Sequence, residues 1–175
     1  MRRAAWPVAA AAAAAVLLVL ALHGRRPESG LVRFEAAGVM TAISPERASD
    51  VRVSAGPRAS HLRRTSDGRW TAGAGAGGGD PTETVERGLR FLHASAPQRV
   101  LEREELDPGS AAEFGLAPPR YVVAVRAAGG ETFTIEFGGL NAQGLAQYAR
   151  VTGRDAIVLL PRFVGEPWQA LAGAP

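Results

Sequence analysis

Hydrophobic and polar residues alternate in short segments along most of the chain, which is the pattern of strands that are buried on one face. The clearest example is residues 132–137, where Phe133, Ile135 and Phe137 alternate with more polar neighbours. Residues 121–126 precede this segment across a turn that contains two glycines, so the pair predicts an antiparallel hairpin. The same pattern predicts further strands over residues 39–43, 50–54, 60–65, 69–71, 99–101, 147–152 and 156–160.

One segment between these strands has helical periodicity. Asp80 is a favourable N-cap, Pro81 suits the first helical turn, and Glu83 stands at the capping-box position. Pro97 is expected to end the helix. The residues that recur on one helical face are Val85, Gly88, Leu89 and Leu92.

Two shorter helical segments complete the expected elements. Residues 110–114 predict a single turn that is closed by Gly115, and residues 163–171 predict a last helix that carries Trp168. These elements predict an α+β fold, in which one mainly antiparallel sheet has one or two covering helices.

The N-terminal part has a different pattern, because no charge interrupts residues 4–22. As a helix they would span roughly 28 Å, close to the hydrocarbon thickness of a bilayer. We therefore predict a transmembrane anchor over residues 1–23, a linker over residues 24–38 and a soluble α+β domain over residues 39–172. The lipid bilayer is the expected partner of residues 4–22.

A cleaved signal peptide is the alternative, since a short basic start precedes the apolar stretch. The sequence Leu-His-Gly at residues 22–24 is a poor cleavage site, because leucine stands where a small residue is needed, so an uncleaved anchor is favoured. Arginines flank both ends of the segment and do not decide its orientation. The short charged tail favours a single-pass protein of the cytoplasmic membrane with its domain on the periplasmic or outer side.

The charge pattern argues against nucleic acid as a partner. All 20 basic residues are arginine, and four of them flank the anchor, which leaves 16 arginines against 17 acidic residues and a charge of −1 beyond residue 26. A nucleic-acid-binding protein needs a concentrated basic stripe, and the cluster at residues 61–64 is too small. Cysteine is absent, which excludes disulfides, thiolate metal sites and cysteine nucleophiles.

Candidate chemistry is sparse. The glycine run at residues 73–79 lacks the residues that complete a phosphate-binding motif, so it predicts a loop. His23, His61 and His93 have no metal-ligand spacing. Glu102 and Glu104, on one face of the strand expected there, are interpreted as a solvated edge. The sequence thus predicts no catalytic, cofactor-binding or metal-binding residue and no cofactor.

Several short motifs follow one another in a recognisable order. They are a turn followed by Trp70, Phe-Gly-Leu-Ala-Pro-Pro at residues 114–119, a strand that ends at Gly138, and Tyr-Ala-Arg at residues 148–150. This order resembles the bacterial family called domain of unknown function 4340 over about residues 40–160, although Ala149 replaces the usual valine. The resemblance implies a membrane-tethered extracytoplasmic protein, in some members beside gliding-type ABC transporter components.

These observations lead to three functional hypotheses. The favoured one is a non-enzymatic, membrane-anchored accessory or protein-interaction module within an envelope or ABC-transporter-associated complex. The second is an extracytoplasmic hydrolase or small-ligand-binding domain, whose site would gather His61, Glu102 and Glu104 from separate segments. The third is a structural spacer without a specific contact surface.

Overall fold

The computed structural model describes residues 37–73 and 80–173. They belong to the second of two compact units, Ala36–Pro175. The expected anchor, most of the expected linker and residues 74–79 of the glycine run lie outside the described residues. Within the described residues, no helix is long and apolar enough to cross a bilayer.

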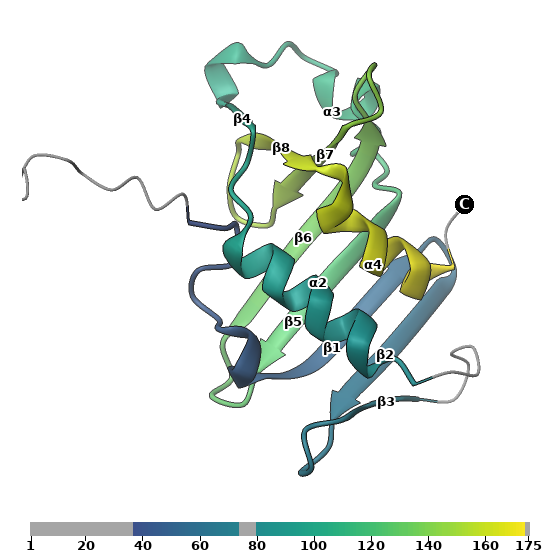
Figure 1. Cartoon of the computed structure of the whole chain (residues 1–175). Helices are drawn as coiled ribbons and strands as arrows, with labels where there is room; N and C mark the ends of the chain where they lie inside the picture. The colour runs from purple at the N-terminus through teal and green to yellow at the C-terminus, as the bar shows by residue number, and fades with distance from the viewer. Residues whose placement is uncertain (1–36, 74–79, 174–175) are drawn as a thin grey trace, which may run out of the picture. The chain divides into compact units, whose positions relative to one another are not determined.

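Within residues 37–73 and 80–173, eight strands form one antiparallel sheet in the order β3-β2-β1-β5-β6-β7-β8-β4 (Figure 1). Two meanders, β1 to β3 and β5 to β8, are joined where β1 pairs with β5, and β4 is added at the edge beside β8. The strands are β1 (Ala48–Ala55), β2 (Arg58–Arg64), β3 (Trp70–Ala72), β4 (Arg99–Leu101), β5 (Tyr121–Ala127), β6 (Thr132–Leu140), β7 (Ala146–Val151) and β8 (Ile157–Pro161).

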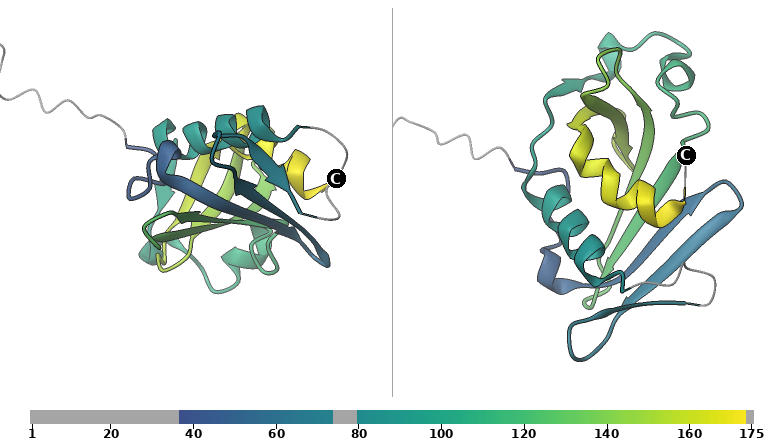
Figure 2. Two further views of the ribbon diagram at one scale, coloured as in Figure 1. Left: turned by 90° about the horizontal axis from the view of Figure 1, so that it is seen from below. Right: turned by 45° about the vertical axis from the view of Figure 1, so that its right-hand side comes forward.

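Two helices cover one face of the sheet, which we call the helix face (Figure 2). Helix α2 (Thr82–Ala94) connects the edge strand β3 to the opposite edge strand β4, and α4 (Arg162–Ala172) follows β8. The described residues also form three short helical turns: η1 (Pro45–Arg47), η2 (Arg103–Glu105) and α3 (Ser110–Glu113). The core lies between the helices and the sheet, and its largest buried side chains are Trp70, Trp168, Tyr121, Phe137, Met40, Ile43, Leu62, Leu89, Leu92 and Ile135.

The close approach of α2, α4 and the sheet depends on two glycines. A Cβ atom at Gly88 of α2 would lie 2.5 Å from Cζ2 of Trp168 in α4. At Gly165 of α4, a Cβ atom would lie 2.1 Å from Oε1 of Gln147 in β7. Both separations are far shorter than van der Waals contact, so these positions leave no room for a larger residue.

A polar contact is buried within this core. The hydroxyl of Tyr121 lies 2.9 Å from Oε1 of Gln147 and 3.1 Å from the carbonyl oxygen of Gly165. Nε2 of Gln147 donates in turn to the carbonyl of Gly138 at 3.0 Å. Burial raises the pKa of Tyr121, because the interior disfavours the phenolate more than its hydrogen bond with Gln147 favours it.

The opposite face of the sheet, which we call the open face, is covered only over β6 to β8 by the described residues. Leu116, Ala146 and Ile157 are buried there outside the main core. The ring of Phe114 stacks on Tyr148 with 4.2 Å between the centroids. Residues 102–119 therefore cover this end of the open face, whereas its part on β2, β1 and β5 has no described cover.

The predicted α+β fold with one antiparallel sheet and covering helices is confirmed. The predicted strand at residues 39–43 is wrong, since no strand forms there. The amides of Gly38 and Met40 instead donate to carbonyls at the end of α2, those of His93 and Leu92. This apolar run is thus buried as irregular chain against the end of α2. Alternation of apolar residues alone does not distinguish such a segment from a strand.

Two local predictions are also corrected. Oδ1 of Asp80 accepts the amide hydrogen of Thr82 at 2.9 Å, but Glu83 pairs with Arg87 instead of completing a capping box. Glu102 and Glu104 lie beyond the end of β4, at the 3-10 turn η2, and not on a strand. Glu105 closes this turn by accepting the amide hydrogen of Glu102 at 3.0 Å.

We expect Gly88→Ala to lower the free energy of unfolding by about 1–3 kcal/mol, because the added methyl group overpacks the contact with Trp168. On an exposed helical face the same substitution would stabilise by up to about 1 kcal/mol. Urea unfolding of the full-length protein, followed by circular dichroism, shows whether the substitution lowers or raises the free energy of unfolding. A more stable variant would contradict the packing described here.

We expect Tyr121→Phe to lower the free energy of unfolding by about 1–3 kcal/mol, because two buried acceptors lose the single hydroxyl proton that lies between them. Folding raises the pKa of Tyr121, so this group contributes to the free energy of unfolding. Its contribution is fully present below the unfolded pKa of about 10 and is lost as the pH rises above that value. Wild-type stability should therefore fall more steeply above that pH than the stability of the variant. Tyr148→Phe, on the other face of the sheet, is the matched control, and equal slopes in the two variants would refute the assignment.

Candidate functional site

Strand β2 directs alternate side chains to the two faces of the sheet, as strand geometry requires. Leu62 is fully buried on the helix face and Arg64 lies on the same side, whereas His61 and Arg63 lie on the open face. Two adjacent arginines, Arg63 and Arg64, therefore have different surroundings.

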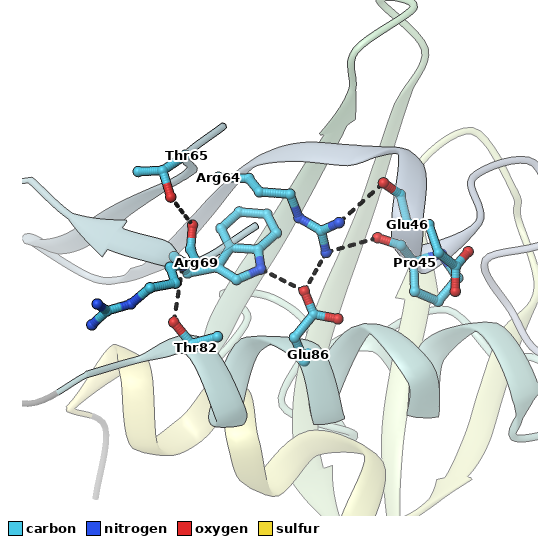
Figure 3. Close-up of polar contacts among 8 residues, drawn as sticks. Pro45, Glu46, Arg64, Thr65, Arg69, Thr82 and Glu86 are labelled. Atoms are coloured by element: carbon cyan, nitrogen blue, oxygen red, sulfur yellow. Dashed lines mark hydrogen bonds and ion pairs between the residues drawn. The ribbon is translucent and has the colours of Figure 1, made fainter. Parts of the chain in front are cut away.

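Arg64 holds β2 against α2 and η1 (Figure 3). Its guanidinium pairs with Glu86 of α2 and donates to the carbonyls of Glu46 at 3.0 Å and Pro45 at 3.2 Å. Oε1 of Glu86 also accepts Nε1–H of Trp70 at 2.8 Å. The guanidinium carbon lies 5.1 Å from the centre of the Trp70 ring, a cation–π distance.

A second contact fixes the edge strand β3 to the start of α2. The amide of Trp70 donates to Oγ1 of Thr82 at 2.9 Å, and Oγ1 of Thr65 donates to the carbonyl of Arg69 at 2.8 Å (Figure 3). The β2–β3 hairpin is thus fixed to the helix layer. Its outward residues consequently have a defined position on the open face.

Strand register brings polar residues from four strands together on the open face. One row across the sheet contains Arg63, Asp50, Arg126 and Thr132, from β2, β1, β5 and β6. The next row contains His61, Arg52, Ala124 and Thr134 from the same strands.

These two rows line a shallow groove with a volume of about 380 Å³. Ala124 has the smallest side chain of the two rows, and longer side chains surround it. The groove is lined by Asp50, Arg52, His61, Arg63, Ala124, Val125, Arg126, Thr132 and Thr134.

The charges of the groove are unequally paired. Asp50 accepts a hydrogen bond from Nε2 of His61 and lies 3.5 Å from Nε of Arg63. The guanidinium groups of Arg52 and Arg126 have no acidic partner among the described residues, and both side chains are exposed. The groove therefore carries an excess of positive charge.

Nearby acidic residues are engaged elsewhere. Glu136 accepts two hydrogen bonds from Arg150, at 2.9 and 2.7 Å. Glu131 pairs with Arg47, and its own backbone amide together with Arg47 lowers the pKa of this carboxyl. Neither acid neutralises Arg52 or Arg126.

This arrangement is suited to binding an anion. Unpaired guanidinium groups bind carboxylates and phosphates through charge-assisted, bidentate hydrogen bonds. The hydroxyls of Thr132 and Thr134 add neutral donors on one side. Among residues 37–73 and 80–173, no group of three or more histidine, aspartate or glutamate side chains is placed to hold a metal ion.

The structure does not bring His61, Glu102 and Glu104 together. His61 lines the groove on β2, whereas Glu102 and Glu104 line a separate pocket of about 580 Å³ beside β4 and β8. Five strands separate β2 from β4 in the sheet. The site that the second hypothesis requires is therefore not formed by these residues.

Of the other residues considered from the sequence, those that the structure describes have structural contacts. His23 lies outside the described residues. Nδ1 of His93 hydrogen-bonds to the carbonyl of Met40 at 3.0 Å, so this side chain fixes the irregular segment before η1. The buried aromatic side chains of Trp70, Trp168 and Tyr121 belong to the core.

Sequence reasoning missed most of the groove. Arg52 alternates with the buried Val51 and Val53, and this alternation places it on the exposed side of its strand. The sequence contains that signal. It contains no signal for the register between β1 and β5, which brings Arg126 to the same groove as Arg52.

Comparison of the chain with protein-family models, with curated proteins and with solved structures gives no match. The resemblance to domain of unknown function 4340 therefore stays a prediction.

We expect Arg64→Met to lower the free energy of unfolding by about 1.5–3 kcal/mol, because Glu86 loses its charged partner while it stays half-buried. Arg69→Met is the matched control, since Arg69 and Asp80 form an exposed pair that is worth less than about 1 kcal/mol. Urea unfolding compares the two variants. Equal losses would contradict the anchoring role of Arg64.

Proposed function

We propose that this protein is a non-enzymatic, membrane-anchored accessory module that binds a partner protein within a membrane complex. Residues 4–22 are the proposed single-pass anchor in the cytoplasmic membrane, and the α+β domain is proposed to lie on the periplasmic or outer side. The family resemblance of the sequence supports an envelope or ABC-transporter-associated complex.

The groove on the open face is the observation that supports the binding part of this proposal. Arg52 and Arg126 are exposed without an acidic partner among the described residues, whereas the neighbouring acids are paired. Arginine is enriched at protein interfaces, where its guanidinium forms several hydrogen bonds at once. A sheet face with such residues is suited to a polar, specific contact.

The same groove also favours a second candidate, a domain that binds a small anion. Its volume lies within the range of ligand pockets. Such pockets are mostly apolar, however, and this groove is lined mainly by charged and hydroxyl side chains. The lining therefore favours a protein partner.

The hydrolase alternative has weaker support. Asp50 could orient His61 in the way that an aspartate orients a catalytic histidine. Within the described residues, no serine or threonine hydroxyl hydrogen-bonds to the other ring nitrogen of His61. The nucleophile that this chemistry needs is thus missing from the arrangement.

Site-specific photocrosslinking in native membranes tests the proposal. We expect a photoreactive residue at Thr132, which is exposed and lines the groove, to crosslink one dominant membrane protein. A photoreactive residue at Arg90, exposed on α2, is the matched control and should not give this product. The bait should stay in the membrane pellet after alkaline carbonate extraction if residues 4–22 anchor it.

Two results would refute the proposal. Release of the bait by carbonate would contradict the anchor. Absence of any specific product at Thr132, with the bait in the membrane, would contradict a partner on the open face.

A further inference from the structure

We infer that the groove of the open face binds an acidic, extended segment of the partner, with carboxylates at alternate positions. This inference rests on the proposed function, because it names the chemistry of that partner. It depends on the charge, the spacing and the hydrogen-bonding groups of the described residues.

The positive charge of the groove is local. Residues 37–175 contain 15 arginines and 15 acidic residues, so this part of the chain has no formal net charge. The groove nevertheless gathers Arg52, Arg63 and Arg126 around a single acid, Asp50. The arginines of the groove attract the carboxylates of an acidic segment that binds here, while salt screens the charges that lie further away.

The spacing of the unpaired arginines matches an extended peptide. Arg52 of β1 is opposite Ala124 of β5, and Arg126 is two residues further along β5. Such diagonal neighbours are about 7–8 Å apart. Side chains on one side of an extended chain recur at about 6.6–6.8 Å, which is twice the rise per residue. Two carboxylates at positions i and i+2 can therefore each meet one guanidinium.

Asp50 favours separated carboxylates over a dense polyanion. It occupies the row between Arg63 and Arg126, so an anion with continuous charge would place negative groups against it. When every second residue of an extended segment is a carboxylate, the uncharged residue between two of them points away from the sheet, so no negative group is forced against Asp50. The hydroxyls of Thr132 and Thr134 are available to the peptide on the other side of Arg126 and Ala124.

An anionic membrane surface is less suited to this groove. Segments that bind such surfaces typically gather four to eight basic residues, and here three arginines surround one acid. The arginines are also fixed on strands, where their spacing selects a ligand of matching geometry. A peptide satisfies both the charge and the spacing.

The test measures binding of a fluorescent peptide of alternating glutamate and threonine, about eight residues long, to the full-length protein in a nonionic detergent. We expect binding that weakens as salt is added. The same peptide with glutamine in place of glutamate should not bind. Arg52→Gln combined with Arg126→Gln should weaken binding about tenfold, as expected for the loss of two exposed ion pairs.

Arg90→Gln combined with Arg154→Gln is the matched control. It removes the same charge from exposed positions on α2 and in the β7–β8 turn, outside the groove. This variant should bind the glutamate peptide as the wild type does. Equal weakening in both double variants would overturn the inference, since net charge alone would then explain binding.

Other probes are added to the same experiment. Binding of inorganic phosphate or of vesicles that contain phosphatidylserine, without binding of the glutamate peptide, would also overturn the inference. If the crosslink at Thr132 persists in the Arg52→Gln, Arg126→Gln variant, the proposed function stands and the acidic segment is refuted. If the peptide binds but no partner crosslinks, the proposed function fails. The groove then binds acidic groups without serving as the contact with a membrane partner.

Discussion

The contact of Trp168 with Gly88 is the constraint on which the layer structure depends. It joins α4 to α2 at a distance that only glycine permits, while Gly165 brings α4 against Tyr121 and Gln147 of the sheet. Both helices, which come from distant parts of the chain, are thereby committed to the same face. Among the described residues, only residues 102–119 cover the other face, and the arginine groove lies on the part that they leave open.

The neighbouring arginines of β2 show how one strand serves two purposes. Arg64 is directed to the helix face, where Glu86, two backbone carbonyls and the Trp70 ring compensate its charge. Arg63 is directed to the open face and only approaches Asp50. A basic pair in the sequence is therefore divided between a structural contact and a binding surface, so its charge cannot be assigned to one surface from the sequence.

The sequence predicted those parts of the fold that have local causes. The hairpin of β5 and β6 follows from alternation around a glycine turn, and α2 follows from the spacing of Val85, Leu89 and Leu92. Pairings between distant segments, such as β1 with β5 and β4 with β8, have no local signal. The candidate site depends on the first of these pairings, which explains why only His61 and Arg63 of its residues were considered from the sequence.

The irregular segment at residues 39–43 also depends on a hydrogen-bonding partner that is distant in the sequence. Its apolar residues resemble a strand, but the end of α2 supplies backbone carbonyls that its amides use in place of a strand partner. Alternation reports burial on one side and does not report which hydrogen-bonding partner a segment finds. For this protein, the charge of a face likewise depends on which strands become neighbours: a chain that is neutral from residue 37 onward gains a basic groove only because β1 and β5 align Arg52 diagonally with Arg126.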